Sequence, residues 1–206
     1  MRVKILNDID DKIQRSDSIH ILNFGSVDRI DYKKQLSGSG KELVKLGRVS
    51  ERLGGATLVG ADSDNCGLLR KSVFIFNGGR LQAICDMNRA EDKYAPAFGY
   101  KTIDYLGKKI GILVDRDLYN PDAVKSLITC GVGAIIDLYE GLFTEKVKTA
   151  CEFYAYVYGV DFIVCCKDKA VAYNAYGEEI SSLSDGVFEF ECVGVYRESK
   201  CKKRGN

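Results

Sequence analysis

The sequence predicts an α/β fold with parallel strands. Two apolar runs rich in β-branched residues, Ile110–Val114 and Ala134–Leu138, flank a segment with helical signals. In that segment Asn120 is a typical helix cap, and Pro121 takes the first helical position. A strand–helix–strand order of this length gives parallel, buried strands. Ligands of such sheets bind beyond the carboxyl ends of the strands, so the candidate site lies at residues 115–119.

Alternation and helical spacing predict the remaining elements. Residues 41–53 repeat leucine and valine at helical spacing, and Thr144 caps a second long helix, Glu145–Tyr158. Asp10–Arg15 adds at most a helical turn or two, and Asn77-Gly78-Gly79 signals a hairpin. The other expected strands are Val3–Leu6, Ile19–Phe24, Ala56–Gly60, Asn65–Phe76, Arg80–Cys85, Asp161–Cys166, Lys169–Tyr173, Glu179–Ser181 and Val187–Cys192.

The composition indicates one globular domain spanning residues 1–206. The chain has 206 residues, 46% of them hydrophobic, which is enough for a sizeable core. The formal net charge is +1 and the charges are well mixed, so we expect no nucleic-acid and no membrane partner. No apolar run approaches the length of a membrane span. Residues 198–206 are polar and basic, and we expect a loose tail there.

The cysteines favour a reducing compartment. None of the eight forms a paired CxxC motif, and His20 is the only histidine, so we expect no metal and no cofactor. We interpret the cysteines, including Cys85 and Cys130, as reduced core residues. The N-terminal segment MRVKILNDIDD carries charges throughout, unlike a signal peptide, so the expected location is the cytoplasm.

Residues Lys108–Leu138 resemble the nucleophile elbow of the nitrilase, or carbon–nitrogen hydrolase, superfamily. Gly111–Val114 matches the family's strand, Asp117-Leu118 its Asp-Leu pair, and Pro121-Asp122 stands where Pro-Glu is expected. The order of elements is similar from Lys41 to Cys192, and residues 1–40 look like a reduced N-terminal part. The resemblance implies a four-layer αββα sandwich, with both long helices on one outer face.

The resemblance does not extend to the catalytic residues. In the family a Cys attacks a nitrile or amide carbon, a Glu moves protons and a Lys holds the developing oxyanion. The matching positions carry Asp115, Phe24 and Ala90. Because such groups act as a unit, three substitutions predict a degenerate site. The expected function is therefore a non-catalytic binding or interaction module without enzymatic activity.

Three roles remain open for Asp115. It is a nucleophile of an unusual carbon–nitrogen hydrolase, or a ligand-binding group, or a carboxylate held in an ion pair with Arg116, Arg89 or Lys93. A shifted alignment would place Lys93 on the family lysine, and Asp92 lies beside it. The candidate pocket residues are Asp115, Arg116, Asp117, Arg89, Glu91 and Lys93.

The resemblance also implies a homodimer. Proteins of this family commonly pair through the helices after the elbow, so we expect Asn120–Thr129 and Val147–Tyr158 to form a two-fold interface. Tyr154, Tyr156 and Tyr158 form an amphipathic surface of the second helix that belongs either to the core or to such an interface, where aromatic residues supply buried area. A small-molecule ligand is the other expected partner.

Overall fold

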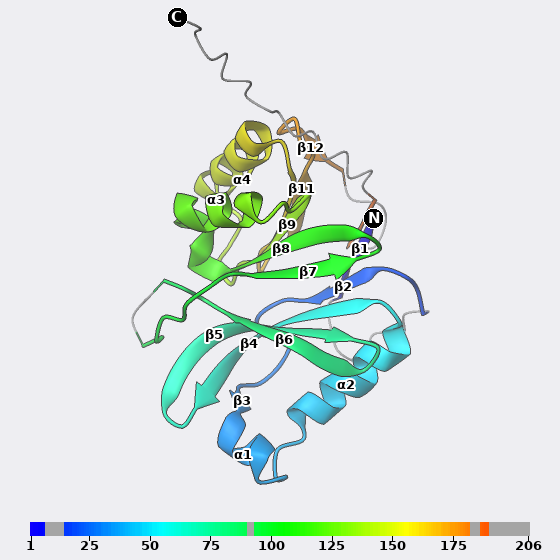
Figure 1. Ribbon diagram of the computed structural model, residues 1–206, viewed down its shortest axis with the longest axis vertical. Coiled ribbons are helices and arrows are strands. Elements are labelled where there is room, and N and C mark those ends of the chain that lie inside the picture. The colour runs from blue at the N-terminus through cyan, green and yellow to red at the C-terminus, as the bar shows by residue number, and fades with distance from the viewer. Residues whose placement is uncertain (7–14, 90–92, 182–185, 190–206) are drawn as a thin grey trace, which may run out of the picture.

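The computed structural model describes residues 1–6, 15–89, 93–181 and 186–189. Two β-sheets pack face to face, with helices on their outer faces (Figure 1). This is the expected four-layer αββα sandwich.

The first sheet combines parallel and antiparallel strands in the order β13-β1-β2-β4-β5-β6, with β3 beside β4. β1, β2 and β4 are parallel, and a hairpin meander of β4, β5 and β6 completes the sheet. The two helices α1 and α2 lie on its outer side in Figure 1. The elements are β1 (Arg2–Leu6), β2 (Ile19–Leu22), β3 (Ile30–Asp31), α1 (Tyr32–Leu36), α2 (Glu42–Leu53), β4 (Ala56–Asn65), β5 (Leu68–Asn77), β6 (Arg80–Asp86) and β13 (Val187–Glu189).

The second sheet contains the predicted strand–helix–strand unit. Its order is β12-β11-β10-β9-β8-β7, and β8, β9 and β10 are parallel. Ile112 lies opposite Ile136, which in turn lies opposite Ile163. The elements are β7 (Lys101–Tyr105), β8 (Lys108–Val114), the 3-10 helix η1 (Asp115–Tyr119), α3 (Pro121–Thr129), β9 (Ala134–Leu138), α4 (Glu145–Tyr158), β10 (Asp161–Cys165), β11 (Ala170–Tyr173) and β12 (Glu179–Ile180).

Both long helices of the second half cover the same outer face, as expected (Figure 1). The Asn120 side chain caps α3 by accepting a hydrogen bond from the Asp122 N–H at 3.1 Å. Thr144 caps α4 by accepting from the Val147 N–H, and Gly159 ends that helix in the left-handed conformation. The cap signals in the sequence therefore set the helix boundaries.

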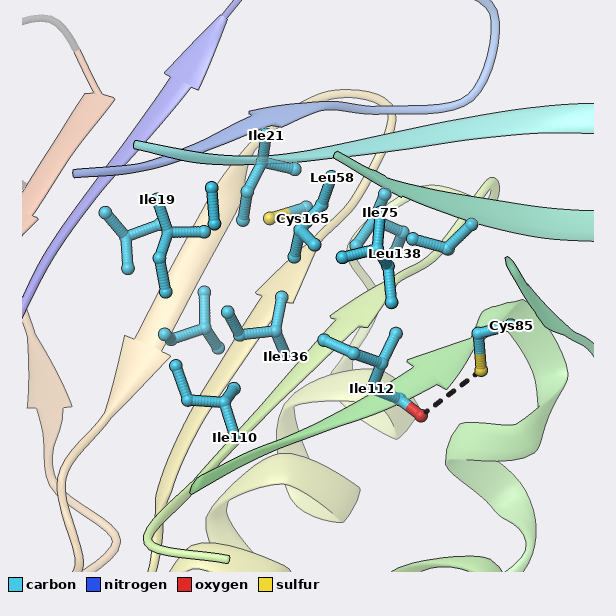
Figure 2. Close-up of a cluster of buried hydrophobic side chains, with 14 of the residues drawn as sticks. Ile19, Ile21, Leu58, Ile75, Cys85, Ile110, Ile112, Ile136, Leu138 and Cys165 are labelled. Atoms are coloured by element: carbon cyan, nitrogen blue, oxygen red, sulfur yellow. Dashed lines mark hydrogen bonds between the residues drawn. The ribbon is translucent and has the colours of Figure 1, made fainter. Parts of the chain in front are cut away.

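Three apolar layers hold the sandwich together. The central layer lies between the sheets, and the outer layers lie under the helices. Strand alternation divides the side chains, because Ile136 faces the central layer and Ile135 faces the helices. Figure 2 shows the central layer, where the Cys85 thiol donates to the Ile112 carbonyl oxygen at 3.8 Å.

The expected strands around residue 60 need correction. The sequence predicts one strand ending at Gly60 and another from Asn65 to Phe76, but β4 continues to Asn65 and β5 begins at Leu68. Cys66 and Gly67 both have positive φ, 54° and 94°, and form a two-residue hairpin turn. The polar residues 62–64 belong to neither expected strand, yet they pair with β5 as part of the continuous strand β4.

Other boundaries differ less. β2 ends at Leu22, so Asn23 and Phe24 lie beyond the strand, and β3, α1 and β7 are additions to the expected elements. Most of Asp10–Arg15, the end of the strand expected to reach Cys192, and the tail 198–206 lie outside the described residues. None of the described helices has the length and apolar character needed to cross a membrane.

The cysteine interpretation is only partly right. Cys85, Cys151, Cys165 and Cys166 are buried and free, as expected for core thiols. Cys66 and Cys130 are exposed, contrary to the expectation. Cys130 caps the C-terminal end of α3, where the apolar face of the helix has already ended.

Candidate functional site

Asp115 occupies a sharp elbow at the carboxyl end of β8. Its φ is +50°, a left-handed conformation that non-glycine residues rarely adopt and that Asp tolerates better than most. The chain passes there directly from the strand into η1. The residue is only 4% exposed. The elbow therefore presents a carboxylate to the interior edge of the two sheets.

The carboxylate of Asp115 is engaged on both oxygens. Its Oδ2 lies 3.9 Å from the ammonium of Lys71, which also forms an ion pair with Glu140. Its Oδ1 accepts a hydrogen bond from the Glu140 N–H at 3.1 Å. Lys71 belongs to β5 of the opposite sheet, and its side chain is 5% exposed. The ion pair thus connects the two sheets at the elbow.

Two aromatic rings lie against the ammonium of Lys71. The centroid of Phe24 lies 5.0 Å from Nζ and that of Tyr94 lies 4.9 Å from it. Gly60 leaves room for Phe24, since a Cβ at that position would lie 3.0 Å from the Phe24 backbone nitrogen. The Tyr94 hydroxyl donates to Asp62 Oδ2 at 2.9 Å, and burial raises the pKa of Tyr94 to about 12.

Asp117 makes different contacts from Asp115. It is 1% exposed, and its carboxylate accepts hydrogen bonds from the Asn88 and Arg89 N–H groups at 3.0–3.1 Å. It therefore holds the segment after β6 against the elbow. Burial raises the pKa of Asp117, and the donors from Asn88 and Arg89 oppose that shift.

The electrostatics of the elbow combine burial with nearby cations. Burial raises the pKa of Asp115, while the charges of Lys71 and Arg116 act in the opposite direction. Asp137, on β9, is fully buried, and burial raises its pKa well above the usual value. Neither Asp137 oxygen has a hydrogen-bond partner among the described residues. The described residues contain no group of three His, Cys, Asp or Glu side chains that could hold a metal.

The structure brings some of the sequence-predicted residues together and not others. One of the three roles left open for Asp115 was an ion pair with Arg116, Arg89 or Lys93. Asp115 does form an ion pair, but its partner is Lys71. Arg116 is exposed, and its charge still reaches Asp115. Arg89 is exposed, and its backbone N–H donates a hydrogen bond to Asp117. Lys93 is also exposed, and its ammonium lies 5.1 Å from the Tyr94 ring centroid. Ala90, Glu91 and Asp92 lie outside the described residues.

Lys71 is the residue that sequence reasoning missed. It alternates with Val73 and Ile75, both of which face the central layer, so period two already placed it on the inner side of β5. The charge concealed this signal, because a lysine usually marks a solvated face. Glu140 was also missed. It lies shortly after β9 and belongs to no motif that the sequence analysis recognised.

A cavity of about 480 Å³ is lined in part by Phe24. Its walls come from the end of β1, the segment after β2, the β10–β11 turn and β13. Phe24 is shared, because its ring lines the cavity and also contacts Lys71. The volume falls in the usual range for small-molecule sites.

Comparison with known proteins identifies the fold. Neither a family model nor a curated protein matches the sequence. Solved structures do match: a mutant of the Nesterenkonia AN1 amidase, from the nitrilase superfamily, superposes with a TM-score of 0.73 at 10% identity, over 91% of this chain and 88% of that one. A carbon–nitrogen hydrolase from Helicobacter pylori G27 gives 0.66 at 15% identity, over 81% and 73%.

A third match comes from a larger protein. The glutamine-dependent NAD+ synthetase of Acinetobacter baumannii gives a TM-score of 0.66 at 15% identity, over 84% of this chain. The match covers only 38% of that synthetase chain. In each case the likeness lies in the sandwich itself. The chain therefore has the αββα fold of the nitrilase superfamily.

Proposed function

We propose that this protein is a non-catalytic binding or interaction module built on the carbon–nitrogen hydrolase fold. The observation that carries the proposal is the Lys71–Asp115 ion pair at the elbow, 3.9 Å between Nζ and Oδ2. A nucleophile needs a free lone pair and room for its electrophile. The Asp115 carboxylate is instead buried against an ammonium and a backbone N–H.

The surroundings of the elbow support the same proposal. Phe24 stands where the family's proton-transfer Glu is expected, and its ring forms a wall against Lys71. A phenyl ring accepts no proton, so the base of the family reaction has no counterpart at this position. Ala90, at the expected lysine position, carries no charge to hold an oxyanion. The ion pair and the cavity lined in part by Phe24 are both compatible with a binding role that needs no catalysis.

An active hydrolase with a displaced site is the second candidate. One observation favours it: Lys71 and the half-exposed Glu140 lie beside Asp115, so two carboxylates and an ammonium converge. In that reading Asp115 attacks the substrate carbon, Lys71 stabilises the oxyanion and Glu140 moves protons. The carboxylate of Asp115 is a weak nucleophile toward an amide carbon, which is why we place this candidate second.

The two candidates differ in a direct assay. A panel of amides and nitriles is incubated with the wild type and with the variants Asp115→Ala, Lys71→Met and Glu140→Gln. We expect no turnover above the buffer control in any of them. Turnover in the wild type that disappears in Asp115→Ala or Lys71→Met contradicts the proposal and supports the displaced active site.

We also propose a cytoplasmic location. The four buried cysteines named above are free, which suits a reducing compartment. Cell fractionation with an antibody tests this directly, since recovery in a secreted or periplasmic fraction would contradict it.

A further inference from the structure

We infer that the outer side of α2 is a docking site for an acidic peptide segment of a partner protein, one that carries both carboxylates and an apolar side chain. A groove of about 770 Å³ lies there between the helix and the loop of residues 37–41 that leads into it. In Figure 1 α2 lies on the outer side of the first sheet. The inference rests on the proposed function, because it names the kind of partner that an interaction module would bind.

Four cations of α2 and its cap position line this groove. They are Lys41, Lys45, Arg48 and Arg52, and all four residues are exposed. Their spacing of four, three and four residues keeps them within about 60° around the helix axis and extends them for about 16 Å along it. Within the described part of the chain, Lys45 and Arg48 form no ion pair, and none of the described lining residues is acidic. The groove therefore presents charge of one sign.

The two glutamates of α2 do not face these cations across the groove. The Glu42 carboxylate accepts hydrogen bonds from the Gln35 side chain and from the Lys41 backbone N–H. Glu51 lies on another side of the helix, against the β5–β6 turn, since a Cβ added at Gly79 would lie 3.1 Å from the Glu51 Cβ. Carboxylates of a partner are thus free to pair with the cations of the groove.

The loop that forms the other wall is held by its own hydrogen bonds. The Gly40 N–H donates to the Lys34 carbonyl oxygen at 2.8 Å, and the hydroxyls of Ser37 and Ser39 lie 2.8 Å apart. A groove whose walls are already ordered loses less conformational freedom when a partner binds.

The floor of the groove is apolar. Val44 and Val49 both line it, and the Val44 side chain is 56% exposed. The hydrocarbon stems of the lysines and arginines add to this surface. A purely charged occupant would leave Val44 uncovered, whereas a peptide with an apolar side chain covers it and pairs with the cations at the same time.

Two other anionic partners match these features less well. A lipid bilayer offers a flat surface, which does not reach the floor of a groove. A nucleic acid supplies phosphates but no side chain for the valines, and its binding depends on a strongly positive protein surface, whereas the formal net charge of this chain is +1. A peptide segment is narrow enough to enter the groove and carries both kinds of group.

The test uses a fluorescein-labelled peptide of about fourteen residues, long enough as a helix to span the four cations. Its glutamates repeat the spacing of the cations and its leucines lie between them, and a comparison peptide has glutamine in place of each glutamate. Anisotropy is measured against the full chain. We expect the acidic peptide to bind at least about tenfold more tightly, because several modest ion pairs add together. Salt should reduce the difference, since it screens exposed charges.

Charge reversals locate the binding. Lys45→Glu and Arg48→Glu should each weaken the acidic peptide about fivefold or more, because attraction becomes repulsion. Lys125→Glu, at an exposed lysine on α3, changes the net charge equally and should leave the affinity within about twofold. Val44→Ser should weaken the leucine-bearing peptide and leave unchanged a version with alanine in place of leucine. Urea unfolding of each variant confirms that the fold is intact.

Three results overturn the inference. The acidic and glutamine peptides bind equally or not at all, or Lys45→Glu and Lys125→Glu weaken binding equally. The third is that phosphatidylserine–phosphatidylcholine vesicles or a DNA duplex bind more tightly than the acidic peptide and are released by Lys45→Glu. Each leaves the proposed lack of catalysis intact. Turnover in the amide and nitrile panel contradicts the proposed function instead, so the two failures are distinguishable.

Discussion

The ammonium of Lys71 lies 3.9 Å from Oδ2 of Asp115, and this contact joins the two sheets of the sandwich. Lys71 extends from β5 into the central layer, and Asp115 meets it at the end of β8. Burying the Lys71 ammonium or the Asp115 carboxylate alone would cost free energy. Their mutual ion pair and the ion pair between Lys71 and Glu140 offset that cost. The positive φ of Asp115 is thus combined with an ion pair between the two sheets.

A thiol placed at the elbow tests whether geometry alone is enough for catalysis. We expect the Asp115→Cys variant to show no amide or nitrile turnover, because Phe24 still offers no base and the residue at position 90 is still not a lysine. The measurement is product formation by mass spectrometry over long incubations. The Asp115→Ala variant is the control for contaminating activity.

Turnover by Asp115→Cys would contradict this expectation in an informative way. It would mean that Glu140 and Lys71 together replace the missing base and oxyanion donor. Adding Glu140→Gln should then abolish the new activity.

The buried carboxyl of Asp137 should make stability depend on pH. Burial raises the pKa of Asp137 in the folded protein, whereas an Asp carboxyl in the unfolded chain has a pKa of about 3.9. The contribution of Asp137 to the free energy of unfolding is therefore fully present below the unfolded-state pKa. It is lost as the pH rises toward the folded-state pKa, by about 1.4 kcal/mol per pH unit between the two pKa values. Asp137→Asn removes this dependence.

We expect Asp137→Asn to gain stability relative to the wild type as the pH rises from about 4 to about 7, with the two proteins most similar at the acidic end. Urea unfolding at several pH values measures the difference. Asp122→Asn, at an exposed carboxylate on α3, is the control for the substitution itself. Parallel curves for wild type and Asp137→Asn would contradict the expectation.

The outer face of α4 is the place where the expected homodimer would form. Phe153 and Tyr156 are each 54% exposed there, and a shallow hollow of about 580 Å³ runs between Tyr119, Lys146 and Phe153. Exposed aromatic residues are enriched at protein interfaces. We expect light scattering to give a dimer at tens of micromolar, an order-of-magnitude concentration for a stable pair.

Phe153→Asp should convert that dimer to a monomer, since a charge in an apolar contact is expensive to bury. Leu36→Asp, at an exposed apolar residue on α1, should leave it dimeric. A wild type that is monomeric at this concentration, or a dimer that only Leu36→Asp disrupts, would contradict the assignment of this face.

The local signals in the sequence were sufficient for most of the fold. The cap at Asn120, the proline after it and the β-branched runs on either side predicted β8, α3 and β9, because these features act over a few residues. The hairpin at Cys66-Gly67 was not predicted. Its turn carries only one glycine, and the polar residues before it gave no apolar alternation.

The candidate site was less predictable because its contacts join distant parts of the chain. The sequence located Asp115 at the elbow and Phe24 near it. It did not identify Lys71, since the pairing of a β5 lysine with a carboxylate after β8 depends on how the two sheets stack.

A double-mutant cycle between Lys71 and Asp115 tests the central claim, that Asp115 serves the ion pair rather than catalysis. The free energy of unfolding is measured for the wild type, Lys71→Met, Asp115→Asn and the double variant. Asn preserves the size of the side chain and tolerates the positive φ of the elbow. We expect Asp115→Asn to destabilise the protein by about 1–3 kcal/mol, because the buried Lys71 ammonium loses the charge of one of its carboxylate partners. The double variant should lose less than the sum, with a coupling of about 0.5–3 kcal/mol. Additive effects, or an Asp115→Asn variant more stable than the wild type, as found when a strained catalytic group is removed, would contradict the claim.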